Sequence, residues 1–222
     1  MEDILTEKGK EDSRAFGQQV KFERLGARHS GTNRTKETID EIYSTAPSQV
    51  RFSTRVKKPL HFNNYFSSEY LEKIRGLILE GKREEAALYQ LNHETDRPDS
   101  GTASARETAA AVATLLKHYL GMEKHFKPDT KLAILNVSHD FVLTPFIAEV
   151  LRKISEKEGE QVSLKEAIAM TGGSLRPLEE IRFSMVEDES KKSLKVFFRG
   201  EEYPLDRKLI DEISDYEQPE EK

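Results

Sequence analysis

KLAILNV, residues 131–137, is the most apolar run of the chain, and Ser138-His139-Asp140 follows it directly. A turn at Pro128-Asp129 stands in front of it. A short, continuous apolar run between turn residues is typical of a strand that is buried on both faces of a parallel sheet. We therefore predict a central parallel strand over 131–137, with His139 just beyond its carboxyl end.

A second stretch, ARHSGT at residues 27–32, follows an earlier candidate strand. In that strand Val20 and Phe22 alternate with charged residues, and the strand is expected to end at Arg28-His29. Folds of the α/β class bind ligands in the loops at the carboxyl ends of parallel strands. If both strands belong to one sheet, the two histidines face the same crevice. Alternatively, each histidine only caps its strand and packs against polar neighbours.

Apolar stripes with helical spacing, together with capping and turn residues, predict helices around these strands. A helix begins at Thr32 or Asn33, and residues 48–56 can form a short helix on which Arg51 and Arg55 share a face. Another begins at Thr144-Pro145, with the proline at its first position. Further helices are predicted over 68–80, 82–91, 103–120, 163–170 and 206–216, and a hairpin over 181–198.

Strands that alternate with helices predict an α/β fold. We expect a three-layer αβα sandwich whose central sheet is mostly parallel, with an antiparallel edge strand or hairpin. One domain is expected over 19–216. Residues 1–18 are predicted to be a mobile tail or a weak helix, and residues 217–222 an acidic tail.

Composition limits the classes of function. The 222 residues carry a net charge of -5, which gives no overall basic field for binding nucleic acid. No apolar run has the length of a membrane span, and the first residues lack the pattern of a signal peptide. The chain has no cysteine, which excludes disulfides and thiolate metal ligands. We expect a cytoplasmic protein without nucleic-acid or membrane partners.

The residues at the two strand ends favour an anion over a metal ion. Two histidines with Asp140 and Glu107 could ligate zinc, but no HExxH or HxH motif is present. The arginine beside His29 would repel a cation, whereas arginine is well suited to binding phosphate. There is also no G-x-S-x-G elbow for a serine hydrolase and no P-loop.

Several motifs, in their order along the chain, resemble the histidine phosphatase superfamily, which has the phosphoglycerate-mutase-like fold. Arg28-His29-Ser30-Gly31-Thr32 resembles the Arg-His-Gly signature of that family, with Ser30 in place of the glycine. The resemblance covers about residues 20–206. The other motifs that carry it are the Ser-rich segment 43–54 with Arg51, Ala105-Arg106-Glu107-Thr108, Val137-Ser138-His139-Asp140, and LRPLEEI at 175–181.

The resemblance implies a metal-independent phosphatase that acts on small phosphomonoesters and needs no cofactor. His29 would attack phosphorus and form a phosphohistidine, with His139 as the second catalytic histidine. The implied phosphate-binding residues are Arg28, Arg51, Thr32 and Arg55. Glu107 is the first choice for the general acid, with Asp140 and Asp99 as alternatives. Residues 57–102 would form a cap that sets specificity.

Two other functions are compatible with the same motifs. One is a mutase that returns the phosphate to its substrate. The other is a catalytically silent relative that binds a phosphorylated ligand or partner, because Ser30 departs from the signature and the acid is not fixed by the motifs.

Overall fold

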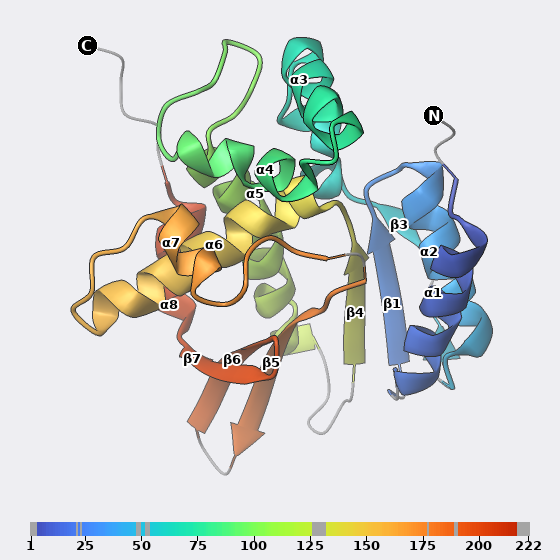
Figure 1. Ribbon diagram of the computed structural model, residues 1–222. Helices are drawn as coiled ribbons and strands as arrows, with labels where there is room; N and C mark the ends of the chain where they lie inside the picture. The colour runs from blue at the N-terminus through green and yellow to red at the C-terminus, as the bar shows by residue number, and fades with distance from the viewer. Residues whose placement is uncertain are drawn as a thin grey trace. The chain divides into compact units, whose positions relative to one another are not determined.

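The structure is a computed structural model that describes residues 4–20, 22, 24–47, 50–51, 54–125, 132–176, 178–188 and 191–216 (Figure 1). Contacts divide the chain into two compact units. The first unit comprises Met1–Asn64 and Met122–His139, and the second comprises Tyr65–Gly121 and Asp140–Lys222. Each unit is described in turn.

The first unit is built on a parallel sheet with β1 (Arg24–His29) at its centre. Over its whole length β1 pairs with β4 (Leu132–Val137). Its other edge pairs with two short strands, β2 (Val50–Arg51) and β3 (Arg55–Val56), as Figure 1 shows for β3. The register aligns His29 with Val137. The two strand ends that carry histidines therefore meet at the same edge of one parallel sheet, as the sequence predicts.

Two helices accompany this sheet. α2 (Asn33–Thr45) begins at the predicted place, with the Thr32 side chain accepting from the Thr35 N–H as its N-cap. α1 (Glu7–Gln19) forms within the segment expected to be a tail or a weak helix, and it packs along α2. Gly17 permits this close contact, since a Cβ there would lie 2.5 Å from the Ile42 carbonyl oxygen.

The short helix predicted over 48–56 is wrong. Val50–Arg51 and Arg55–Val56 are strands that pair with opposite ends of β1. Hydrogen bonding to β1 and the β-branched Val50 and Val56 favour the extended backbone over the weak helical pattern. Arg51 and Arg55 therefore share no helix face. Two 3₁₀ turns, Lys58–Leu60 and Phe62–Asn64, follow the second of these strands.

The second unit is mainly helical. α5 (Ala105–Gly121) packs against α6 (Asp140–Lys157) and α8 (Arg207–Ser214), and all three contribute buried aliphatic side chains. α6 begins at Asp140 and not at Pro145, which lies inside the helix. The proline thus removes one backbone hydrogen bond near the helix start without ending the helix. The remaining helices are α3 (Ser68–Leu79), α4 (Arg83–Leu88), η3 (Tyr89–Asn92) and α7 (Leu164–Ala169).

The predicted hairpin is confirmed as β5 (Ile181–Asp188) and β6 (Lys191–Phe198). Among the described residues it pairs with β7 (Glu201–Leu205) in an antiparallel sheet of its own and not with the parallel sheet. The expected class is confirmed: the chain is α/β, with a parallel sheet, flanking helices and a small antiparallel sheet.

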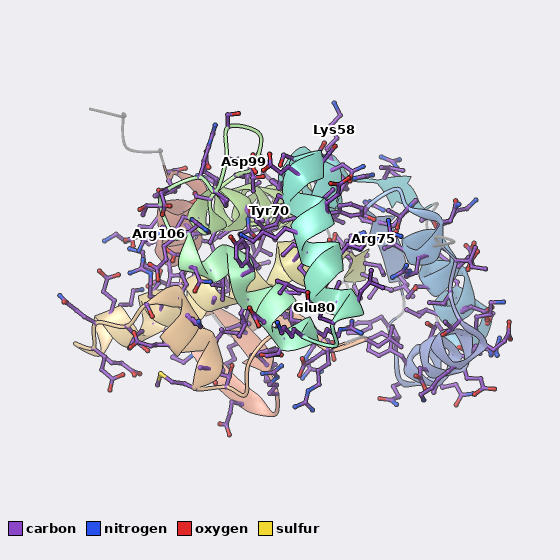
Figure 2. The ribbon with its side chains drawn as sticks, turned by 45° about the horizontal axis from the view of Figure 1, so that its top comes forward. Lys58, Tyr70, Arg75, Glu80, Asp99 and Arg106 are labelled. Carbon is purple, nitrogen blue, oxygen red and sulfur yellow. The ribbon has the colours of Figure 1, made fainter. Side chains whose placement is uncertain are left out.

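Figure 2 shows Tyr70 and Arg75 on opposite sides of α3, in line with the burial of Tyr70 and the exposure of Arg75.

Candidate active site

The two predicted histidines meet through Ser30. His29 ends β1 and is 7% exposed, and Ser30 directly after it is fully buried. The Ser30 hydroxyl lies 3.1 Å from Nε2 of His139, which stands two residues beyond the end of β4. The parallel pairing of β1 and β4 therefore gathers these side chains at one edge of the sheet.

Gly31 makes the turn from the strand into α2. Its φ is +104°, a region that favours glycine, and a Cβ there would lie 3.3 Å from Cγ1 of Val56. Ser30 has no positive φ. The turn thus needs its glycine one residue later than the signature has it, and the backbone accepts a serine at position 30.

A cluster of hydroxyl groups lies beneath the turn. Ser30 Oγ is 2.9 Å from Thr35 Oγ1 and 3.4 Å from Thr32 Oγ1. Thr35 Oγ1 also donates to the Thr32 carbonyl oxygen over 3.0 Å. Thr32, predicted to bind phosphate, has an additional role as the N-cap of α2.

The His29 ring accepts a hydrogen bond from the Gly31 N–H to Nδ1, over 3.2 Å. This bond needs a lone pair on Nδ1, so a neutral ring carries its proton on Nε2. Burial lowers the pKa of His29, the positive charge of Lys36 lowers it further, and Asp40 opposes them. The ring of His29 therefore stays neutral at pH values at which the ring of an exposed histidine is already protonated.

Residues 58–64 form a wall beside the two histidines. The Lys57 N–H donates to the His29 carbonyl oxygen over 2.9 Å, and the Ser138 hydroxyl donates to the Leu60 carbonyl oxygen over 2.6 Å. The rings of Phe62 and His139 are 4.8 Å apart and nearly perpendicular. An open pocket of about 510 Å³ lies at this wall. It is lined by Gly31, Thr32, Asn33, Arg34, His61, Phe62 and Asn63.

Two of the three predicted arginines, Arg28 and Arg55, lie side by side on paired strands. Arg28 donates to the Ala27 carbonyl oxygen, and its buried Nε has no hydrogen-bond partner among the described residues. The sheet register places the exposed Arg55 beside it. Arg28 and His29 are consecutive strand residues, which project to opposite faces of a sheet. The side chain of Arg51 lies outside the described residues.

The first-choice acid, Glu107, belongs to the second unit and is engaged there. Burial raises its pKa, but hydrogen bonds from the Arg97 side chain and the Ser104 backbone N–H outweigh this and lower it. Asp99 resembles it, since hydrogen bonds from Ser67 and Thr102 outweigh burial and hold the pKa of Asp99 below its usual range. Both carboxylates are thus ionised and serve as local acceptors.

Asp140 also belongs to the second unit, but the balance of effects on its pKa differs from that of Glu107 and Asp99. It is the first residue of α6, its carboxylate lies 3.7 Å from Arg83, and it accepts from the Phe141 N–H. Burial nevertheless dominates and raises the pKa of Asp140. Of the three candidate carboxyl groups, it is the one whose pKa is raised.

The structure thus brings together His29, His139 and Thr32, and it shows three contacts that sequence reasoning missed. These are the bond from Ser30 to His139, the tether from Ser138 to Leu60, and the contact between the rings of Phe62 and His139. The His-Ser order in the motif could have drawn attention to Ser30.

Within the described ranges, no group of three His, Cys, Asp or Glu side chains is placed to hold a metal ion. None of the described helices is long and apolar enough to cross a membrane.

No family model matches the sequence, and no curated protein matches it. The structure is similar to that of a mycobacterial glucosyl-3-phosphoglycerate phosphatase in complex with VO3, with a TM-score of 0.49 and 12% sequence identity. The match covers 85% of this chain and 81% of that one. Similarity at this level assigns no activity to this chain.

Proposed function

We propose that the chain is a phosphatase that hydrolyses small phosphomonoesters through a phosphohistidine on His29. One observation supports it most: His29 and His139, 110 positions apart in the sequence, are joined through one buried serine at the carboxyl edge of a parallel sheet. This edge is where α/β folds bind their ligands. A pocket lined by residues 31–34 and 61–63, but by neither histidine, has the size of a small-molecule site.

The surroundings of the pocket suit an anion. The first residues of α2 line it, and the N-terminus of a helix attracts negative charge. The buried Arg28 Nε needs an acceptor, and Arg55 adds positive charge beside it at the same end of the sheet. Arg51 is proposed as a further phosphate ligand from its motif alone.

The reaction proceeds in two displacements. A lone pair on the neutral His29 ring attacks phosphorus, the bond from phosphorus to the leaving oxygen breaks, and an acid protonates that oxygen. Water then attacks the phosphohistidine, the P–N bond breaks, and the same carboxylate accepts the proton of the water. His139 and the arginines stabilise charge on the phosphoryl oxygens during both steps, so the residues need no metal ion or cofactor.

Asp140 is the better supported acid. A general acid must hold its proton near neutral pH, and a raised pKa makes this possible. Burial raises the pKa of Asp140, whereas the hydrogen bonds of Glu107 and Asp99 lower theirs. We therefore place Asp140 ahead of Glu107, the residue that the motif favours.

A catalytically silent, phosphate-binding protein is the second candidate, and one contact favours it. The Gly31 N–H occupies the Nδ1 lone pair of His29, so the neutral ring carries its proton on Nε2. Attack through Nε2 then requires that the proton moves to Nδ1 and that the contact with Gly31 breaks. A mutase is the nearest alternative enzyme and shares the same first step.

Turnover of a generic aryl phosphate in the presence of EDTA tests the proposal. We expect turnover by the wild-type protein. In His29→Ala, turnover should fall by about 10²–10⁴-fold or more, because a positioned catalytic side chain contributes a factor of this size. Thr38→Val, which removes another buried hydroxyl of α2, is the matched control and retains activity. Phosphate binding without turnover of any phosphomonoester supports the silent protein, and loss of turnover in EDTA contradicts the metal-free reaction.

A further inference from the structure

We propose that Arg83 is a positioning residue that holds a positive charge at the carboxyl group of Asp140, and that Glu84 keeps Arg83 in this place. Arg83 and Glu84 lie in the first turn of α4, and Asp140 begins α6, against which α4 packs (Figure 1). Both helices belong to the second unit. The catalytic consequence of this inference rests on the proposed function, whereas the contacts themselves do not.

The carboxylate of Asp140 meets two groups that favour its charged form. Its Oδ1 accepts from the Phe141 N–H over 3.1 Å, and its Oδ2 lies 3.7 Å from Nη2 of Arg83. Among the described residues, Arg83 is the side-chain charge with the largest effect on the pKa of Asp140, and it lowers this pKa against the effect of burial. The Arg83 side chain is 64% exposed and that of Asp140 is 19% exposed, so the arginine reaches from solvent to a largely buried carboxylate.

Glu84, the next residue along α4, is bound by the loop that follows α7. Ser174 donates to its carboxylate twice, from the backbone N–H over 2.9 Å and from the hydroxyl over 2.6 Å. The loop leaves room for this carboxylate because position 173 is glycine, where a Cβ would lie 2.3 Å from Glu84 Oε1. A helix of six residues has little stability of its own, so the first turn of α4 depends on contacts such as these two bonds.

The loop that carries Ser174 is itself fixed on two sides. The guanidinium group of Arg199 donates through two nitrogens to the carboxylate of Glu179. It also donates to three carbonyl oxygens of the loop, those of Thr171, Gly173 and Ser174. On the other side, the Leu175 N–H donates over 3.3 Å to the buried hydroxyl of Thr144, which lies near the start of α6. These contacts connect the first turn of α4 to the first turns of α6.

A positive charge at this place suits a group that acts as both acid and base. In the proposed reaction, Asp140 protonates the leaving oxygen and then, as the carboxylate, accepts a proton from water. Burial alone favours the protonated form, whereas Arg83 favours the carboxylate. The pKa of such a group is best placed near the working pH, because both forms are then accessible. Arg83 therefore brings the two forms of Asp140 closer in free energy than burial alone does.

A carbon-13 NMR titration of the carboxyl groups in the full-length, ligand-free protein tests the inference, with the Asp140 signal assigned by its loss in Asp140→Asn. We expect the pKa of Asp140 to rise in Arg83→Gln, because the opposing charge is removed. It should stay closer to the wild-type value in Arg83→Lys, which keeps the charge. Lys82→Gln is the matched control, because it removes the neighbouring charge, which pairs with Glu80 over 2.8 Å. This control leaves the pKa of Asp140 unchanged.

A second set of variants tests the role of Glu84. Ser174→Ala removes the hydroxyl donor without a change in charge, and we expect the pKa of Asp140 to rise as in Arg83→Gln. Thr171→Val is its control and leaves this pKa unchanged, since the Thr171 hydroxyl donates to a carbonyl oxygen of α7. If Ser174→Ala does not fold, Glu84→Ala decides the same question, because alanine favours the helix. Loss of the negative charge alone would lower the pKa of Asp140, so a rise reports that Arg83 has moved.

An unchanged pKa of Asp140 in Arg83→Gln overturns the inference. An unchanged pKa in Ser174→Ala, or an unchanged or lowered pKa in Glu84→Ala, overturns the role of Glu84. If the protein is an active phosphatase, the alkaline limb of its kcat/KM profile also moves to higher pH in Arg83→Gln. An inactive protein with the expected titrations contradicts the proposed phosphatase and leaves the roles of Arg83 and Glu84 intact. An active protein in which Arg83→Gln does not change the titration contradicts this inference alone.

Discussion

His29 combines burial with a hydrogen bond from a backbone N–H, and both stabilise its neutral form. Burial disfavours the charged ring, and Gly31 occupies Nδ1. Because the folded protein has the lower pKa, the unfolded chain binds more protons between that pKa and the ordinary value of about 6.5. The contribution of His29 to stability is therefore complete above that ordinary value and is lost as the pH falls through the lowered pKa.

The charge of Lys36 should be measurable in the pH profile. The nucleophile must be neutral, so kcat/KM rises with pH through the pKa of His29. Lys36→Gln removes a positive charge that lowers this pKa, and we expect the acid limb of the profile to move to higher pH. Asp40→Asn should move it to lower pH. Both side chains are exposed, so the two shifts shrink at high salt. An acid limb that is the same in all three proteins contradicts the assignment to His29.

The identity of the acid can be tested with leaving groups. Asp140→Asn should slow hydrolysis of an alkyl phosphate by about 10²–10⁴-fold, because its poor leaving group needs a proton, and should slow an aryl phosphate much less. Glu107→Gln is the matched control, because it removes a carboxylate that accepts a hydrogen bond from Arg97. This variant should show no such dependence on the leaving group. The reverse pattern would restore Glu107 as the acid. In the wild-type protein, activity should fall as the pH rises through the raised pKa of Asp140.

Sequence reasoning found the residues that carry distinctive chemistry at strand ends, and missed those whose importance is only spatial. His29 and His139 follow recognisable apolar runs. The bond between Ser30 and His139 spans 109 positions, and no local pattern encodes it. The proposed ranking of the acids differs from the one that the motif implies, because the pKa of a carboxyl group depends on burial and on partners such as Arg97 that the motif does not contain.

At the scale of elements, capping and periodicity predicted the starts of several helices. Thr32 caps α2, and Ser163 with Glu166 forms a capping box on α7. The helix predicted over 48–56 is wrong, because strands of two residues are stabilised by pairing with β1 and leave no periodic pattern of their own. The predicted start of α6 is also wrong. Proline is typical of the first position of a helix, but Pro145 is tolerated about one turn after the start at Asp140.

The turn between β1 and α2 gives a test at this scale. Gly31→Ala places a side chain at a φ of +104° and against Val56 and His61. We expect the free energy of unfolding to fall by about 1–3 kcal/mol in a chemical denaturation experiment. Gly76→Ala is the matched control: it lies inside α3 with no atom near the new Cβ, and it should stabilise by about 0.5–1 kcal/mol. Equal effects of the two substitutions contradict the special role of the Gly31 turn.

At the scale of the whole molecule, the order of apolar runs predicted the α/β class and the parallel pairing of the two strands. It did not predict that the hairpin joins β7 in a separate sheet. Alternation shows that strands have one buried face, but their partners are set by contacts distant in sequence. α1 was also underestimated, because its sequence is polar and it depends on α2 and on the close approach at Gly17.

Covalent labelling of His29 tests the central claim most directly. The wild-type protein and His29→Ala are mixed with a phosphomonoester, quenched in alkali because phosphohistidine is labile in acid, and digested for mass spectrometry. We predict a phosphate group on His29 in the wild-type protein during turnover and none in His29→Ala. Turnover by the wild-type protein with no phosphate on His29, or with the phosphate on another residue, would contradict the account.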